Sequence, residues 1–301
     1  MKTTVKLPNF LIIGVQKAGT TSIYNYLNQH PQVYMSSVKE TNFLERDWQL
    51  LAPEIQDKYP KGIFSEEKYF RLFENVGGEI AIGEASPNYL FHYDLSIPQI
   101  LKYVPNAQLI TVLRNPTDRA FSDYLMHVRD AVGKNHQPLA EQIKKRSQQS
   151  FVLRKGLYYE PLKHFIDTFG KEKISVFLYD DLCQDAVKFM QEIYTCIGVD
   201  STFVPNTSHK AQVAQVPKNE SINNILKTKN PLRNSVGFVL RYILPEETRQ
   251  KIRNGLINLN SSGKDKISLS STDKEACLNF YREDILKVQD LINRDLSAWL
   301  K

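Results

Sequence analysis

Near its N-terminus the chain reads Phe10-Leu-Ile-Ile-Gly14-Val-Gln-Lys17-Ala-Gly19-Thr20-Thr21-Ser22. An apolar segment typical of a buried strand runs into a loop with a glycine at each end, and a helical pattern follows. Backbone N–H groups at the start of a helix, together with the positive end of its dipole, bind an anion without a charged side chain. The stretch therefore predicts a strand, a phosphate-binding loop and a helix.

The lysine of this loop does not stand where an ATP-binding loop has it. The pattern G-x-x-x-x-G-K-[ST] places the lysine directly after the second glycine, where it reaches the β- and γ-phosphates. Gly14 and Gly19 keep that spacing, but Lys17 lies inside the loop and Thr20 occupies the usual lysine position. We expect a nucleotide whose reactive end is not a Mg-bound triphosphate.

Short apolar runs and helical patterns alternate along most of the chain. The predicted strands are 9–14, 79–83, 107–113 and 173–179, and the predicted helices are 20–29, 96–104, 116–130, 157–169, 183–197 and 273–295. Near-continuous apolar runs suit parallel strands that are covered on both faces. The pattern predicts an α/β fold, a P-loop-like, doubly wound parallel sheet with a helical C-terminal extension, whose ligand lies at the carboxyl ends of the strands.

Local signals mark several boundaries. Asn115-Pro116 supplies an N-cap and a first-turn proline, and Thr272-x-x-Glu275 reads as a capping box before the last long helix. The polar stretch 206–219 is predicted to be a loop over the ligand face. We interpret 1–301 as a single domain, with a nucleotide-binding core over about 7–200 and a loop and helical extension over about 201–301.

Composition limits the classes of protein that the chain can represent. The 301 residues are 42% hydrophobic, enough for a large core, and Lys plus Arg (39) exceed Asp plus Glu (33) by 6. A positive excess suits polyanionic ligands, but no zinc-finger spacing or aromatic RNA-binding pattern indicates nucleic acid. Cys183, Cys196 and Cys277 predict reduced thiols rather than disulfides or a zinc site. Without an apolar leader or a run of about 20 apolar residues, we expect a soluble, cytoplasmic protein with no membrane span.

A second motif reads Val112-Leu-Arg114-Asn115-Pro116-Thr-Asp-Arg119-Ala-Phe-Ser122. It predicts a strand that ends in arginine and a helix that carries Asn115, Asp118 or Arg119, and Ser122 on one face. Arginine and serine in these places clamp a phosphate by charge-assisted and hydroxyl hydrogen bonds. The alternative is that Arg114 pairs with a carboxylate and Ser122 is an ordinary helix residue.

Together the two motifs resemble the sulfotransferase family that uses 3′-phosphoadenosine 5′-phosphosulfate (PAPS), closest to its heparan sulfate branch and that branch's bacterial relatives. The resemblance implies that the first loop holds the 5′-phosphosulfate and that Arg114 and Ser122 hold the 3′-phosphate. It also implies that Lys17 stabilises charge on the bridging oxygen as the S–O bond breaks. The loop residues implied in donor binding are Lys17, Ala18, Gly19, Thr20, Thr21 and Ser22.

Two further segments resemble acceptor elements of the same family. Lys39-Glu40-Thr-Asn-Phe-Leu44 is similar to K-E-x-x-F-F, which implies that Glu40 is the general base. Glu84-Ala-Ser-Pro-Asn-Tyr89 is similar to E-K-T-P-x-Y, although Ala85 replaces the lysine that glycan enzymes often carry. Glu84 is a second candidate base, or a support for Lys17 or Glu40.

Two weaker matches complete the comparison with the family. Lys155-Gly-Leu-Tyr158 opens a G-x-Y helix, which we interpret mainly as packing. Lys210 is the candidate nucleotide contact of a late basic loop.

The predicted reaction moves a sulfuryl group from PAPS to a hydroxyl or amine without a metal, and leaves adenosine 3′,5′-bisphosphate. A saccharide is the first choice of acceptor and a small secondary metabolite the second. A P-loop kinase or NTPase is the rival, because Glu84 and Asp180-Asp181 each end a predicted strand as a Walker-B acid does. A nucleotide-binding regulatory module is the non-enzymatic alternative. The displaced Lys17 and the strand-ending Arg114 argue against the kinase.

Overall fold

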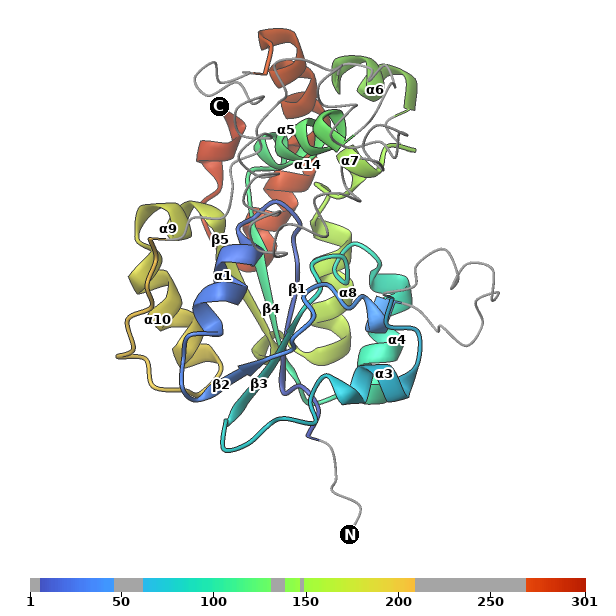
Figure 1. The fold of residues 1–301 in the computed structure, drawn as a ribbon. Helices are drawn as coiled ribbons and strands as arrows, with labels where there is room; N and C mark the ends of the chain where they lie inside the picture. The colour runs from blue at the N-terminus through green and yellow to red at the C-terminus, as the bar shows by residue number, and fades with distance from the viewer. Residues whose placement is uncertain (1–5, 46–61, 131–138, 147–148, 209–268) are drawn as a thin grey trace, which may run out of the picture.

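The computed structural model describes residues 6–45, 62–130, 139–146, 149–208 and 269–301. Within them, parallel strands form one sheet in the order β2-β3-β1-β4-β5 (Figure 1). The strands are β1 Phe10–Gly14, β2 Val33–Met35, β3 Ala81–Ala85, β4 Gln108–Leu113 and β5 Ile174–Leu178. The chain leaves β1 toward one edge and later crosses to the other, so the crevice at the carboxyl end of β1 is where such a sheet binds its ligand.

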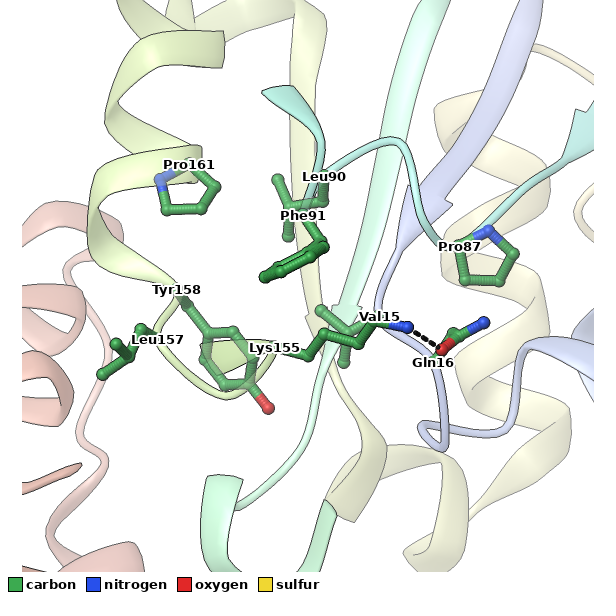
Figure 2. A pocket seen from close by; sticks show the side chains of 9 residues that line it. All are labelled: Val15, Gln16, Pro87, Leu90, Phe91, Lys155, Leu157, Tyr158 and Pro161. Atoms are coloured by element: carbon green, nitrogen blue, oxygen red, sulfur yellow. Dashed lines mark hydrogen bonds between the residues drawn. The ribbon is translucent and has the colours of Figure 1, made fainter. Parts of the chain in front are cut away.

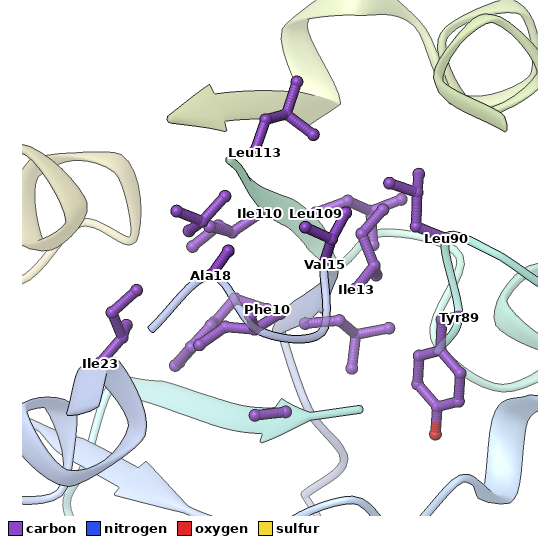
Figure 3. Close-up of a cluster of buried hydrophobic side chains, with 14 of the residues drawn as sticks. Phe10, Ile13, Val15, Ala18, Ile23, Tyr89, Leu90, Leu109, Ile110 and Leu113 are labelled. Atoms are coloured by element: carbon purple, nitrogen blue, oxygen red, sulfur yellow. The ribbon is translucent and has the colours of Figure 1, made fainter. Parts of the chain in front are cut away.

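The central strand β1 forms the middle of the core. All of its residues are buried, and Figure 3 shows Phe10 and Ile13 packed among side chains that include Leu109 and Ile110 of β4. A central parallel strand is apolar on both faces because helices cover both. Burial of each Leu, Ile or Phe side chain contributes about 1.5–3 kcal/mol to the stability of the fold. The apolar run of β1 therefore strongly predicts a buried strand.

The helices cover both faces of the sheet and continue beyond its carboxyl edge. In Figure 1, α1 and α10 lie on one side and α4 and α8 on the other, while α14 packs against α5, α6 and α8. The six predicted helices are confirmed as α1, α4, α5, α8, α10 and α14, whereas α6 and the shorter helices were not predicted. The bounds are α1 Thr20–Leu27, η1 Phe43–Glu45, α3 Glu66–Arg71, α4 Tyr93–Tyr103, α5 Pro116–Asp130, α6 Leu139–Arg146, α7 Phe151–Arg154, α8 Tyr159–Phe169, η3 Lys171–Lys173, α9 Tyr179–Gln184, α10 Ala186–Cys196, α14 Ser271–Ile292 and η4 Ser297–Leu300.

Two predicted boundaries are wrong in an informative way. Strand β3 is two residues later than predicted, because Ile80 is 55% exposed whereas Glu84 lies fully buried inside the strand. A prediction based on apolar runs ends the strand before a carboxylate. The Glu84 carboxylate nevertheless lies inside the strand, because protein hydroxyl groups bind it in place of water. Helix α14 begins before Thr272, and its cap is Ser270, whose Oγ accepts from the N–H of Asp273 at 3.0 Å. The predicted Asn115 cap is confirmed, since its Oδ1 accepts from the N–H of Thr117 at 2.9 Å.

The C-terminal extension is held to the core by polar contacts, of which those of Asp284 and Asp180 are part-buried and that of Asp181 is exposed. Asp284 of α14 accepts from the N–H groups of Tyr158 and Tyr159 at 2.8 and 3.2 Å, and so caps α8 from another helix. Burial raises the pKa of Asp284 to about 6. The acidic pair after β5 is engaged in the same way: Trp299 Nε1 donates to Asp180 at 2.8 Å, and Arg294 pairs with Asp181 at 2.7 Å. This pair therefore anchors the C-terminal segment, which removes its resemblance to a Walker-B acid.

Candidate active site

The loop after β1 has the backbone of an anion cradle. Lys17 and Gly19 have φ values of 73° and 77°, and a Cβ on Gly19 would lie 2.7 Å from Leu182 Cδ2, so the loop requires glycine there. Gly19 is also the N-cap of α1 and supplies no side-chain acceptor. Because first-turn N–H groups have no acceptor within their own helix, this arrangement suits a bound anion.

The predicted loop residues differ in what they expose. Ala18 and Thr20 are buried, with exposed fractions of 0% and 5%, so their side chains do not reach the surface. Thr21 is exposed and Ser22 is half-buried. Thr21 and Ser22 are therefore the predicted donor-binding residues of α1 that are accessible at the surface.

The two predicted phosphate segments are in direct contact. Arg114 Nη1 donates to the carbonyl of Lys17 at 2.8 Å, and the Nζ of Lys17 lies 3.5 Å from Met126 Sδ on α5. Half-buried Ser122 stands one turn before Met126 on the same helix. The structure thus brings Lys17, Arg114 and the first turns of α5 together at the carboxyl ends of β1 and β4.

Arg114 is held from several directions and keeps one donor without a partner. Its guanidinium carbon lies 4.7 Å above the ring of Tyr179, and its carbonyl accepts from the hydroxyl of Tyr158 at 2.8 Å. Burial raises the pKa of Tyr158, so that hydroxyl remains a donor. Arg114 Nε is buried and has no hydrogen-bond partner among the described residues. A buried N–H left unpaired is costly, and a phosphate oxygen would satisfy it.

Arg119, left open above as part of the same ligand-facing helix surface, is buried and bonded to other parts of the protein. Its side chain is 0% exposed and pairs with Asp123 at 3.1 Å, while Nη2 donates to the carbonyl of Val152. The residue therefore joins α5 to α7. Sequence spacing placed Arg119 near the correct face, but burial assigns it to packing.

The predicted base lies on a loop docked against β3. Glu40 is exposed, its Oε1 lies 2.5 Å from Lys39 Nζ, and its N–H donates to the carbonyl of Ala85 at 2.9 Å. Glu40 and Asn42 have φ values of 61° and 50°. Backbone in this region costs of order 1–3 kcal/mol per non-glycine residue, so the neighbouring contacts must hold the loop in place.

Glu84, the other predicted carboxylate, is enclosed. Its side chain is 0% exposed, and four hydroxyl groups donate to it at 2.6 to 2.7 Å, those of Thr41, Tyr69, Ser86 and Tyr89. Charge-assisted bonds of this kind offset the desolvation of a buried carboxylate. One of these partners, Thr41, had no role of its own in the sequence interpretation, although it directly follows Glu40.

A pocket opens beside the phosphate loop, between the segments after β1 and β3 and the turn before α8 (Figure 2). Lys155 crosses it and donates to Gln16 Oε1 at 2.7 Å and to Asn88 Oδ1 at 3.1 Å. Burial lowers the pKa of Lys155. Sequence analysis treated Lys155 only as the start of a packing helix, because nothing local shows that its ammonium joins two distant loops. The lining residues are Val15, Gln16, Pro87, Leu90, Phe91, Lys155, Leu157, Tyr158 and Pro161.

One predicted contact lies outside the described residues, and metal sites and membrane-spanning helices were sought within them. Lys210 and most of the predicted loop 206–219 fall outside the described residues. Among those that are described, no group of three or more His, Cys, Asp and Glu side chains is arranged to hold a metal ion. The described helices also include none with the length and apolar character needed to cross a membrane.

Comparison with known families decides between the interpretations of this site. Residues 7–257 match the family model described as "Sulfotransferase domain". The chain belongs to the sulfotransferase family. Membership favours the sulfotransferase interpretation over a P-loop kinase and over a regulatory module.

Individual sulfotransferases resemble the chain over different spans. The membrane-associated sulfotransferase kil1 of Dictyostelium discoideum is 34% identical over 118 residues, which are 39% of this chain and 22% of that protein. Human bifunctional heparan sulfate N-deacetylase/N-sulfotransferase 2 is 30% identical over 212 residues, 66% of this chain and 23% of that protein. A sulfotransferase crystal structure from Alicyclobacillus acidocaldarius is 28% identical, covers 99% of this chain and 100% of its own, and has a TM-score of 0.70. The chain spans between 13% and 44% of the length of the curated relatives it matches.

Proposed function

We propose that this sulfotransferase transfers a sulfuryl group from PAPS to a hydroxyl or amine acceptor. The observation that carries the donor assignment is the 2.8 Å bond from Arg114 to the carbonyl of Lys17. It joins the anion cradle after β1 to an arginine after β4 whose buried Nε has no hydrogen-bond partner among the residues that the structure describes. A nucleotide with one phosphate at each end of its ribose fits two such neighbouring sites, whereas a triphosphate chain needs one extended cradle.

The residues divide the reaction between them. Glu40 accepts the proton of the acceptor as the new bond to sulfur forms. Lys17 and the N–H groups at the start of α1 stabilise the negative charge on the phosphate oxygen whose bond to sulfur breaks. Arg114 and Ser122 bind the 3′-phosphate and so select the nucleotide. The products are the sulfated acceptor and adenosine 3′,5′-bisphosphate, and no step in this scheme requires a metal ion.

A saccharide is the acceptor that we favour, with a small alcohol, phenol or amine as the second choice. Support comes from the K-E-x-x-F element around Glu40 and from the names of relatives such as human carbohydrate sulfotransferase 15. The pocket between Gln16 and Phe91 adds an aromatic side chain and an ammonium next to the loop. Aromatic faces pack against the C–H faces of sugar rings and equally against planar rings, so the pocket admits both classes.

Calorimetry tests the donor assignment directly. Adenosine 3′,5′-bisphosphate is expected to bind more tightly than ATP with Mg²⁺, because only the former presents phosphates to both sites. Tighter binding of ATP, or turnover that depends on Mg²⁺, would contradict the proposal and restore the kinase alternative. Sulfate transfer from labelled PAPS into saccharide and phenol panels then identifies the acceptor class.

Variants test the assignment of the base. Glu40→Gln is expected to abolish turnover while the Kd of adenosine 3′,5′-bisphosphate stays within about twofold, since Glu40 contacts the acceptor rather than the nucleotide. Glu67→Gln is the matched control, because this glutamate is exposed on α3 and pairs with Arg71 of the same helix at 2.7 Å. Normal turnover in Glu40→Gln would remove the residue from the base role.

A further inference from the structure

Glu84 connects the end of β3 to the loop that carries Glu40. Three of the hydroxyl groups that donate to Glu84 also accept a hydrogen bond from a backbone N–H of that loop. Ser86 Oγ accepts from Asn42 at 3.1 Å, the hydroxyl of Tyr89 accepts from Leu44 at 3.0 Å, and Thr41 Oγ1 accepts from Phe43 at 3.2 Å. Each hydroxyl can do both because it has one hydrogen to donate and lone pairs to accept with.

The direction of these bonds depends on the carboxylate. A hydroxyl that donates to Glu84 turns its lone pairs toward the N–H groups of residues 42–44. Burial raises the pKa values of Tyr69 and Tyr89, and the charge of Glu84 raises them further, so both phenols remain donors. Replacing the carboxylate by a group that also donates would force at least one hydroxyl to turn round.

The loop needs this support because its backbone is strained. Glu40 and Asn42 both have positive φ, a backbone conformation that residues other than glycine adopt with difficulty. The N–H of Glu40 is bound to Ala85, the neighbour of Glu84 in β3. The loop is therefore held to β3 at its first residue by the backbone and at the next residues by the hydroxyl groups around Glu84.

The same enclosure argues against Glu84 as a second base. The carboxylate is fully buried, Oε1 accepts three hydroxyls and Oε2 accepts the hydroxyl of Tyr69. An acceptor hydroxyl would have to displace these donors to reach it. Glu40, on the loop beside β3, is the accessible carboxylate, with 41% of its side chain exposed.

We infer that Glu84 is a positioning residue, which places the Glu40 carboxylate through the hydroxyls of Thr41, Ser86 and Tyr89 and does not itself exchange a proton with the acceptor. This inference rests on the proposed function in so far as Glu40 is the base. Its structural half, that Glu84 holds residues 40–44, stands independently. A displacement of about 1 Å in a reacting group lowers rates by about 100-fold, which sets the scale of the expected effect.

The first measurement needs no activity. Hydrogen exchange is followed in peptides that cover residues 40–45, in the wild type and in Glu84→Gln and Tyr89→Phe variants. Both variants are expected to increase exchange at the amides of Asn42 and Leu44 while β1 keeps its protection. Tyr34→Phe is the matched control, because its hydroxyl donates to the carbonyl of Leu72 and not to Glu84. Unchanged protection of residues 40–45 in both variants would overturn the inference.

The second measurement uses kinetics. Glu84→Gln is expected to lower kcat by about 10- to 100-fold and Tyr89→Phe by a smaller factor, with the Kd of adenosine 3′,5′-bisphosphate unchanged. The acidic limb of the pH profile of kcat persists in Glu84→Gln, because the base is still present. Loss of that limb in Glu84→Gln would show that Glu84 is the base, and a wild-type kcat in both variants would show that positioning does not matter. If Glu84→Gln does not fold, Tyr89→Phe decides.

These outcomes are distinct from failure of the proposed function. Absence of sulfate transfer by the wild type rejects the proposed reaction, and full activity of Glu40→Gln rejects Glu40 as its base. The exchange experiment on residues 40–45 still accepts or rejects the structural role of Glu84 in either case.

Discussion

Replacing Arg114 by methionine tests how the chain selects a nucleotide with a 3′-phosphate. The substitution keeps much of the aliphatic volume and removes the guanidinium, which bonds the Lys17 carbonyl at 2.8 Å and stacks on Tyr179 at 4.7 Å. It also removes the buried Nε that has no partner among the described residues. We expect a loss of nucleotide affinity that is concentrated on the 3′-phosphate.

The magnitude follows from the contacts. A hydrogen bond to a charged group contributes about 1.5–3 kcal/mol, and relief of the unpaired Nε adds to it. The wild type should therefore prefer adenosine 3′,5′-bisphosphate over adenosine 5′-monophosphate by about 2–4 kcal/mol, or roughly 30- to 1,000-fold. In Arg114→Met the preference should fall below about tenfold. Ser122 and the general positive charge of the site account for the preference that remains.

The assay is a thermodynamic cycle of four dissociation constants, two nucleotides against two proteins, measured by calorimetry. The cycle isolates the coupling between Arg114 and the 3′-phosphate from any general weakening of the loop. Arg71→Met is the control, since this arginine is exposed on α3 and pairs with Glu67. An unchanged preference in Arg114→Met would refute the assignment of the 3′-phosphate site, even if both affinities fell.

Three other predictions concern the rest of the chain. Lys17→Ala is expected to lower kcat by about 100-fold or more, because removing one preorganised stabilising group commonly costs that much; a kcat within tenfold of wild type would remove Lys17 from the leaving-group role. Lys155→Met is expected to weaken the link between Gln16 and Asn88 and to raise the acceptor KM more than the nucleotide Kd. Lys155→Arg is expected to keep part of the wild-type acceptor KM, and equal effects of Lys155→Met on both ligands would contradict the prediction. Asp284 has its pKa raised to about 6 by burial, from 3.8 in the unfolded chain, so the folded state binds the extra proton and unfolding free energy should fall by about 3 kcal/mol as pH rises from about 4 to about 6. Denaturant titrations of wild type and Asp284→Asn across that range test this, and a difference between the two that does not vary with pH would disprove it.

The sheet was predictable where the signal is local. Strand β1 and helix α5 agree with their predicted ranges to within a residue, because an apolar run and an Asn-Pro cap act on their own neighbours. Strand β2 was missed, since Val33–Met35 is too short to show a pattern. Strand β3 was displaced because its buried Glu84 owes its place to hydroxyls up to 43 residues away.

In the candidate site, too, local motifs were predictable and contacts between distant segments were not. The sequence motifs located the loop of Lys17, the arginine after β4 and the loop of Glu40. They did not show that Arg119 is buried against Asp123, or that Lys155 spans a pocket to reach Gln16 across 139 positions. Such contacts depend on which surfaces the sheet brings together, and spacing along the chain carries no record of that.

The sequence alone predicted a phosphate-bearing ligand and the sulfotransferase family, because glycine positions, a helix start and an arginine at a strand end are local requirements for binding phosphate. It left open whether Glu84 is a base or a support, and whether the lysine inside the loop meets the second phosphate segment. Tertiary structure decided the second point through the bond from Arg114 to the Lys17 carbonyl, and it supports the positioning role on the first by burying Glu84 under four hydroxyls. The physical reason is that burial and hydrogen bonding between distant segments set the role of a charged side chain, and both exist only once the chain has folded.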